Sequence, residues 1–215
     1  MMDFNERLRA AARAGDAAKL NALLRKPGSN ALSKNPGGWT ALMCAACDGY
    51  EEAVRILLPV SDAATKNNGG MTALMYASWV GHVACVSLLL TAGGVLVPSQ
   101  NGMTALMWAA AYGRKDCVAL LLPVSDVLAK TDAGLTALMH AAAGGHDASI
   151  KLLLPTSQAL DQDSKGITAS GWARSEGFED TAQFLEAYVL SQSERSSIGD
   201  AVPLEAPPQR AAPRV

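Results

Sequence analysis

Four cysteines and three histidines are the residues that could bind a metal or carry out redox chemistry. Cys44 and Cys47 form a CxxC pair, but no second CxxC or histidine pair follows at the spacing that zinc sites use. Free cysteine more often behaves as a small core residue, so we expect a packing role for this pair, with a metal or redox role as the alternative. We expect Cys85 and Cys117 to be packing residues as well.

The other residues that could support catalysis show no arrangement typical of an active site. No carboxylate recurs beside His82, His140 or His146 in a nucleophile-base-orienter pattern. The glycine pairs at 69–70 and 93–94 lack the lysine of a phosphate-binding loop. The sequence therefore predicts neither an enzyme nor a cofactor site.

Composition and charge limit the classes of protein to which this chain could belong. The 215 residues are 49% hydrophobic, 18% charged and only 5% aromatic, which fits a folded chain rich in small and aliphatic side chains. A net charge of −2 gives no reason to expect binding to nucleic acid or to anionic membranes. We find no secretory signal and no apolar run long enough to cross a bilayer, so we expect a cytoplasmic protein, with association with the cytoskeleton as an alternative.

An internal repeat organises most of the chain. TALM begins at Thr40, Thr72, Thr104 and Thr136, and a degenerate TASG begins at Thr168, with a spacing of 32 residues each time. A glycine follows each threonine by nine residues and another precedes it by two. So many columns in phase indicate a stack of similar units.

Each unit is predicted to contain two short helices and a tight loop. The threonine is suited to cap a helix start, which predicts a first helix over about 41–47 in the first full unit, ended by Gly49. A second helix should span about 51–58 and stop at Pro59. Alanine pairs such as Ala45-Ala46 mark where neighbouring helices approach closely. Because such units cannot bury their apolar faces alone, they must stack.

The pattern T-A-L-M-x-A-A, followed by G-H and V-x-x-L-L, resembles the ankyrin-repeat family, whose signature is T-P-L-H-x-A. This resemblance implies an all-α ankyrin-repeat solenoid of about six units including the capping units. Alanine replaces the family's proline and methionine its histidine, so we expect an apolar methionine ladder in place of the threonine-histidine network. The TALM and LLPVSD segments are also similar to those of the expanded ankyrin-repeat proteins of diplomonad protists.

We divide the chain into four parts. Residues 1–35 are predicted to form an N-terminal capping unit, 36–163 four repeats, 164–190 a C-terminal capping repeat, and 191–215 a disordered tail rich in proline, serine and alanine. Ser170, Arg174 and Glu186 replace residues that are mostly apolar in the other units, as a solvent-facing cap requires.

The resemblance implies that a partner binds on the concave side, formed by loop tips and the exposed face of each first helix. The column before each threonine and the positions after the alanine pair would supply the contacts. The predicted binding residues are Trp39, Met71, Trp79, Val80, Met103, Tyr112 and Leu135. The alternative for the apolar column is a ladder in which its members stack on one another.

The predicted function is that of a non-catalytic interaction scaffold, expected to be a monomer, that binds a protein partner of unknown identity. A regulatory or targeting subunit of a protein kinase is the alternative. Residues 1–35 carry a net charge of +4, which could orient an acidic partner or be a solvated capping surface.

Overall fold

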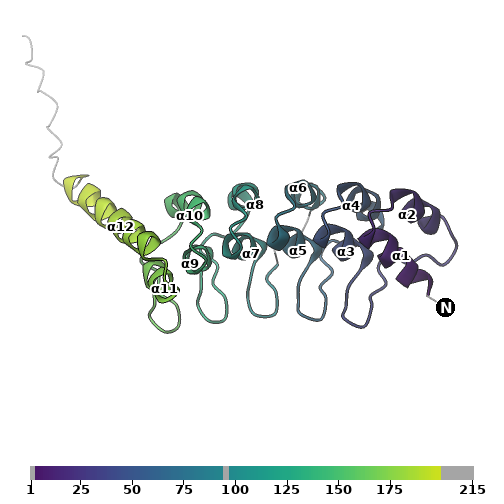
Figure 1. The fold of residues 1–215 in the computed structure, drawn as a ribbon, viewed down its shortest axis with the longest axis horizontal. Helices are drawn as coiled ribbons and strands as arrows, with labels where there is room; N and C mark the ends of the chain where they lie inside the picture. Colours follow the sequence, from purple (N-terminus) through teal and green to yellow (C-terminus); the bar gives the residue numbers. More distant parts are fainter. Residues whose placement is uncertain (1–2, 94–96, 200–215) are drawn as a thin grey trace, which may run out of the picture.

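The protein is a row of helix-turn-helix pairs (Figure 1). The computed structural model describes residues 3–93 and 97–199, with only the backbone for 195–199. Within these ranges all regular elements are helical. The pairs are α1 (Phe4–Arg13) with α2 (Ala17–Leu24), α3 (Ala41–Cys47) with α4 (Glu51–Leu57), α5 (Ala73–Val80) with α6 (Val83–Thr91), α7 (Ala105–Ala111) with α8 (Lys115–Leu121), α9 (Ala137–Ala143) with α10 (Asp147–Leu153), and α11 (Ala169–Ser175) with α12 (Glu179–Gly199). The all-α solenoid of about six units is therefore confirmed.

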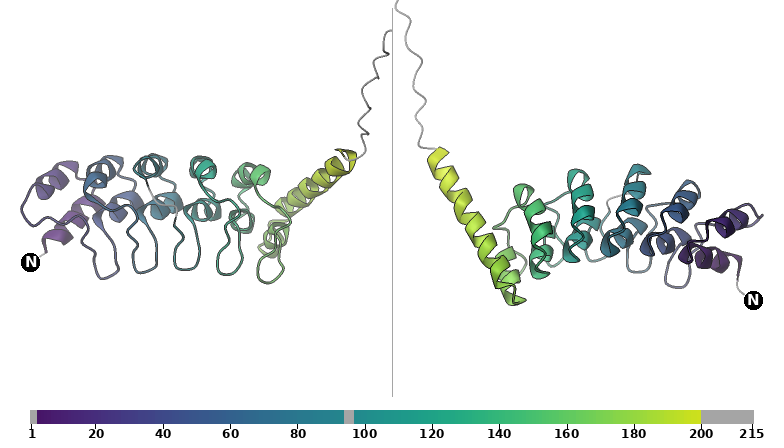
Figure 2. Two further views of the ribbon diagram at one scale, coloured as in Figure 1. Left: turned by 180° about the vertical axis from the view of Figure 1, so that it is seen from behind. Right: turned by 45° about the horizontal axis from the view of Figure 1, so that its top comes forward.

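First helices and second helices form two separate layers. Each first helix contacts the first helices of neighbouring units, and α2, α4, α6, α8 and α10 do the same in the second layer. The connecting loops project together from the side of the first helices (Figures 1 and 2). A side chain on a first helix can therefore lie beside its counterpart in the next unit.

The repeated threonine begins each first helix from α3 onward. In four units its hydroxyl accepts a hydrogen bond from the backbone N–H of the TALM methionine, as from Met43 to Thr40 at 3.3 Å, and in the last unit Gly171 donates instead. The TALM methionines are each 1% exposed, and the Met107 sulfur also accepts a bond from the Thr104 N–H. The predicted caps and methionine ladder are confirmed.

Small residues line the contacts between helices. The alanine pairs of α3, α7 and α9 are fully buried, as are Ala53, Cys85, Cys117 and Ser149 in the second helices. A methyl group, a thiol or a hydroxyl leaves room for a neighbouring backbone, which explains the chain's alanine content. The packing role expected for Cys85 and Cys117 is confirmed.

Proline ends the second helix as predicted, with one refinement. The α-helix stops one residue earlier, at Leu57, and Pro59 lies within a single 3₁₀ turn. The three such turns in the described chain are η1 (Leu58–Val60), η2 (Leu122–Val124) and η3 (Leu154–Thr156). A 3₁₀ turn accommodates proline because its first residues need no N–H donor.

The loops are closed by a residue five positions before the threonine. The Asn67 N–H donates to the Met71 carbonyl, and the Asn67 side-chain oxygen accepts bonds from the N–H groups of Gly69 and Met71. Adjacent loops are joined through Lys66, whose ammonium donates to the Pro98 carbonyl. These bonds hold the loops in register along the array.

A side chain at the start of each second helix covers the glycine of the preceding unit. Gly49 has φ +77°, and a Cβ built on it would lie 2.5 Å from the His82 ring. The His82 Nε2 lies 3.0 Å from the Cys47 carbonyl and must donate to it, because a carbonyl oxygen only accepts. His146 bonds to Ala111 and Arg114 to Trp79 in the same way. These are structural contacts between units.

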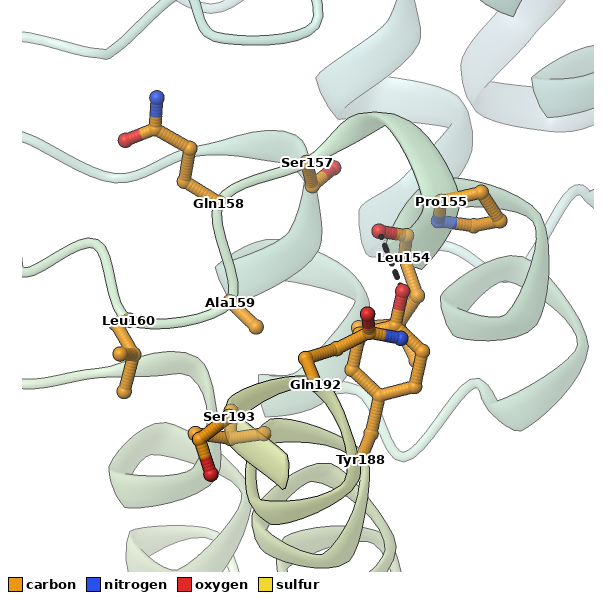
Figure 3. Close-up of a pocket in the computed structure, with 10 residues that line it drawn as sticks. Leu154, Pro155, Ser157, Gln158, Ala159, Leu160, Tyr188, Gln192 and Ser193 are labelled. Atoms are coloured by element: carbon orange, nitrogen blue, oxygen red, sulfur yellow. Dashed lines mark hydrogen bonds between the residues drawn. The ribbon is translucent and has the colours of Figure 1, made fainter. Parts of the chain in front are cut away.

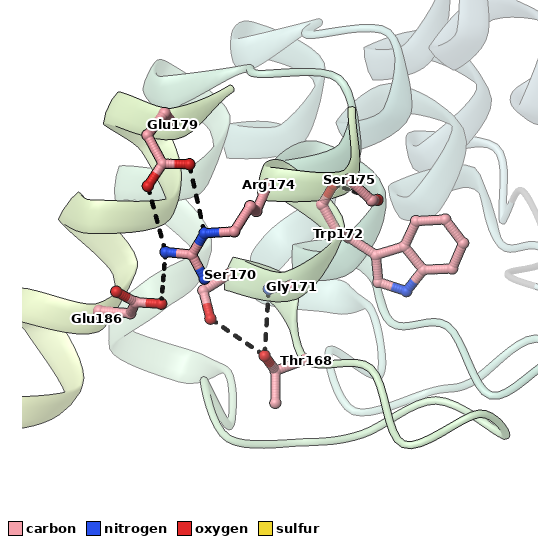
Figure 4. Close-up of polar contacts among 8 residues, drawn as sticks. All are labelled: Thr168, Ser170, Gly171, Trp172, Arg174, Ser175, Glu179 and Glu186. Carbon is pink, nitrogen blue, oxygen red and sulfur yellow. Dashed lines mark hydrogen bonds and ion pairs between the residues drawn. The ribbon is translucent and has the colours of Figure 1, made fainter. Parts of the chain in front are cut away.

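The C-terminal end of the array is polar at its outer face. Arg174 contacts Glu179 at 3.3 Å and Glu186 at 3.0 Å, and the hydroxyls of Thr168 and Ser170 lie 3.1 Å apart (Figure 4). No further unit covers these groups in the described chain, and the side chains of Arg174, Glu179 and Glu186 are exposed. This polarity agrees with the substitutions noted in the sequence, and the assignment of residues 164–190 as a capping repeat stays a prediction.

One predicted boundary is wrong. The tail was expected to begin at residue 191, but α12 continues to Gly199. Its residues from 191 onward include Ser191, Gln192 and Glu194, which lack a periodic apolar face but are compatible with a solvated helix extending a packed one. The rest of the predicted disordered tail lies outside the described residues.

A candidate protein-binding face

Five aromatic side chains form a continuous row along the first helices, which we call the aromatic strip. Its members are Trp39, Tyr76, Trp79, Trp108 and Tyr112. Trp39 precedes α3, Tyr76 and Trp79 lie on α5, Trp108 lies on α7, and Tyr112 is the C-cap residue of α7. Neighbouring ring centroids are 4.2–6.1 Å apart, which is the range of favourable aromatic contacts.

Helix geometry explains how two units build one strip. Tyr76 and Trp79 are three residues apart on α5, and Trp108 and Tyr112 are four apart on α7, so each pair shares a helix face. Because α5 contacts α7, Trp79 lies beside both aromatics of the next unit, at 5.7 Å and 5.6 Å.

One ring of the strip is buried in the protein, and the others are at least partly exposed to solvent. Tyr76 is only 5% exposed and its hydroxyl accepts a 2.7 Å hydrogen bond from the Asn67 amide. Tyr112 is 44% exposed, and Trp39, Trp79 and Trp108 are partly exposed. The strip therefore presents half-buried rings that are already held in place by one another.

Charged side chains lie at the N-terminal end of the strip. The Arg13 guanidinium lies over the Trp39 ring, 5.9 Å from its centroid. Burial raises the pKa of the Cys44 thiol, with Arg13 acting in the opposite direction. Arg9 and Arg13 border a depression of about 480 Å³ together with Asp3 and Glu6.

At its other end the strip stops because the side chains become small. The positions equivalent to Trp79 and Tyr112 are Ala143 and Gly144 in the next unit. His140, in the column of Tyr76 and Trp108, is mostly buried, and burial lowers its pKa and favours the neutral ring.

Two buried nitrogens along this column lack a hydrogen-bond partner in the described structure. Trp172 Nε1 donates to Asp163, which lies nine residues before it, but Ser99 and Thr131 stand at the equivalent positions for Trp108 and His140. The side chains of Ser99 and Thr131 are shorter than that of aspartate. Trp108 Nε1 and His140 Nε2 remain unpaired.

The predicted binding residues fall into three groups. Trp39, Trp79 and Tyr112 belong to the strip, and Val80 is half-buried next to Trp79. Met71 and Leu135 are half-buried and pack against the core, and both interpretations of their column stay predictions.

Met103 contradicts the prediction of an exposed column. It is 7% exposed and lies within the hydrophobic core. Its side chain is not accessible to a partner.

The sequence analysis missed Tyr76 and Trp108 as members of this face. The spacings of three and four residues to Trp79 and Tyr112 were the signal that could have placed both on the same face.

The other residues with reactive or metal-binding side chains lie apart from the aromatic strip or from one another. Burial raises the pKa of Cys85 and of Cys117 to about 11, so both stay as thiols at neutral pH. Among the residues that the structure describes, no three metal-binding side chains come together, and no helix is long and apolar enough to cross a membrane.

A second depression, of about 520 Å³, lies between α12 and the loop after η3 (Figure 3). Its lining carries no charged side chain, and the Tyr188 hydroxyl is already 3.4 Å from the Leu154 carbonyl, to which it donates. We therefore regard the aromatic strip as the better candidate site.

Comparisons with known proteins agree with this architecture. The chain matches the family described as "Ankyrin repeats (3 copies)" over residues 8–97, 81–131 and 92–164. No curated protein sequence matches. A solved complex of the predatory endopeptidase Bd0816 from Bdellovibrio bacteriovorus with immunity protein Bd3460 contains a similar chain, with a TM-score of 0.75 and 30% identity over 84% of this chain and 97% of that one. Given the repeated caps, the helix pairs and the family match over most of its length, this chain belongs to the ankyrin-repeat family.

Proposed function

We propose that the protein is a non-catalytic module that binds a partner protein through the aromatic strip. The observation that carries the proposal is the half-exposed row of tryptophan and tyrosine rings on the first helices. Tryptophan and tyrosine are enriched where protein interfaces gain most of their affinity, because they bury a large area and lose little side-chain entropy.

The strip is also pre-organised for binding. Trp79 contacts three other rings, so it cannot move freely before a partner arrives. A rigid surface loses less entropy on association than a flexible one. Interactions between proteins are also what the family and the solved complex support.

Tyr112→Ala tests this proposal against a matched control. Tyr112 is 44% exposed on the strip, whereas Tyr50 is 40% exposed away from it, so Tyr50→Ala removes the same side chain at similar exposure. Captured partners should be lost with Tyr112→Ala and retained with Tyr50→Ala, with folding checked by thermal unfolding. Equal capture by the wild type and by folded Tyr112→Ala would contradict the assignment of the site.

A narrower candidate is that the partner is a peptidase whose activity this chain restrains. The alignment with our chain covers nearly the whole length of the similar chain, which comes from a complex of an endopeptidase with an immunity protein. An all-helical repeat chain fits the immunity-protein side of such a complex, and our chain would act likewise.

This candidate can be separated from the general proposal. A partner captured from cells that produce the protein would be purified and assayed for peptide-bond hydrolysis with increasing amounts of wild type or Tyr112→Ala. Hydrolysis that stops near one equivalent of wild type, and persists with Tyr112→Ala, would support a peptidase inhibitor. A captured partner without peptidase activity would contradict it and leave the general proposal standing.

Four further statements stay proposals. They are the kinase-subunit alternative, the monomeric state, the cytoplasmic location and the likeness to diplomonad arrays. Exclusion of nucleic acid as a partner likewise rests on the net charge alone.

A further inference from the structure

Arg13 places a positive charge at the end of the aromatic strip. Its guanidinium lies over the Trp39 ring, 5.9 Å from the ring centroid, and it lines the same depression as Cys44. A guanidinium carries five N–H donors in a planar fork, so most of them remain free at its edge. The stacking orients this edge before any ligand binds.

Neither Arg13 nor Arg9 forms an ion pair in the described structure. The acidic groups nearest to them are Asp3 and Glu6, which share the same depression, and Asp48, which lies near Cys44, but none approaches within ion-pair distance. Over residues 1–35 basic side chains exceed acidic ones by four. Although two carboxylates line the same depression, neither arginine is neutralised by an ion pair, so Arg13 can pair with a negative group of a partner.

We infer that the segment bound on the aromatic strip carries a carboxylate that pairs with Arg13, close to an aromatic or large aliphatic side chain that packs on Trp79 and Tyr112. This inference rests on the proposed function and adds the chemistry of the partner. A planar carboxylate matches the free edge of a guanidinium through two parallel hydrogen bonds.

The dimensions of the strip limit how the segment binds. Ring-to-ring steps of 4.2–6.0 Å lead from Trp39 through Tyr76 and Trp79 to Tyr112. An extended chain rises about 3.3 Å per residue, so about five residues cover this path. The carboxylate and the apolar side chain should accordingly occur within one short segment, with the apolar residue toward α7.

Selection from a phage library of random linear peptides tests the inference. We expect peptides captured by the wild type to share an Asp or Glu and, a few residues away, an aromatic or large aliphatic residue. Arg13→Gln should lose the acidic preference and keep the apolar one. Lys19→Gln removes an exposed positive charge from α2 in the other layer and should change neither.

A selected peptide can then be titrated against each variant by fluorescence. Changing its Asp or Glu to the amide should weaken binding to the wild type about fivefold, and should not change binding to Arg13→Gln, because a partly exposed charge pair contributes about 1 kcal/mol. Arg13→Lys should recover only part of the effect, since it restores the charge without the planar fork.

The outcomes distinguish this inference from the function on which it rests. Peptides that need Tyr112 but show no acidic preference would overturn the inference and leave the proposed function intact. If no captured peptide is sensitive to folded Tyr112→Ala, both are overturned. Unchanged thermal unfolding of Arg13→Gln confirms that a lost preference reflects recognition.

Discussion

Replacing Gly49 with alanine tests whether the contact between units stabilises the array. Gly49 has φ +77°, a backbone conformation that costs an alanine about 1 kcal/mol or more. The new Cβ would also lie 2.5 Å from the His82 ring, which must move. Moving the ring breaks the hydrogen bond to the Cys47 carbonyl, worth about 0.5–1.5 kcal/mol. We therefore expect a loss of about 2–3 kcal/mol in the free energy of unfolding.

Gly177 is the matched control because it holds the same position in the last unit. Its φ is +85°, and nothing lies within 4 Å of an added Cβ. Gly177→Ala should cost only the backbone strain, about 1 kcal/mol. Urea unfolding followed by circular dichroism measures both losses.

A double-mutant cycle assigns the excess loss to the histidine. In a His82→Ala background the ring is absent, and Gly49→Ala should cost no more than Gly177→Ala does in the wild type. Additive effects of Gly49→Ala and His82→Ala, together with equal losses at both glycines, would refute the reasoning.

Three further predictions concern the core, an acidic group and the thiols. Ala109→Leu should overpack the fully buried contact of α7 and cost about 1–3 kcal/mol, measured by urea unfolding, whereas Leu at the exposed Ala119 should be neutral. Hydrogen bonds, chiefly from the Ile167 N–H, hold the pKa of Asp163 below its usual range. The ionised Asp163 should therefore stabilise the fold above the carboxyl's pKa in the unfolded chain, and this stabilisation should be lost as pH falls through its lower pKa in the folded chain. Asp163→Asn should lessen the loss of stability in acid, measured by tryptophan fluorescence as a function of pH. Alkylation at mildly alkaline pH should label the half-buried Cys47 before Cys85, as checked by mass spectrometry, because burial raises the pKa of Cys85 to about 11; simultaneous labelling would contradict the packing.

Helix starts could be predicted from the sequence because their causes are local. A threonine hydroxyl caps the N–H three residues later, so the register of TALM alone placed the start of α3 at Ala41. The same local logic placed the end of the second helix near Pro59. The methionine ladder followed from the repeat, since identical positions in stacked units meet the same neighbours.

Burial within the loops and the composition of the binding face needed the tertiary structure. Met103 and Met71 share a column, but Met103 is buried and Met71 is half-buried, so the column alone does not determine burial. The aromatic strip joins residues of different columns, Trp79 and Trp108, whose proximity depends on how α5 and α7 pack.

By itself the sequence determined the repeat, the helices, their caps and the stacked architecture, because these depend on hydrogen bonds and apolar periodicity within about one unit. Only the tertiary structure decided which aromatic rings meet, that Arg13 lies over Trp39, and that α12 extends to Gly199. Contacts between units depend on how side chains from different columns fit together and on their rotamers. A comparison of equivalent positions within one column shows neither of these.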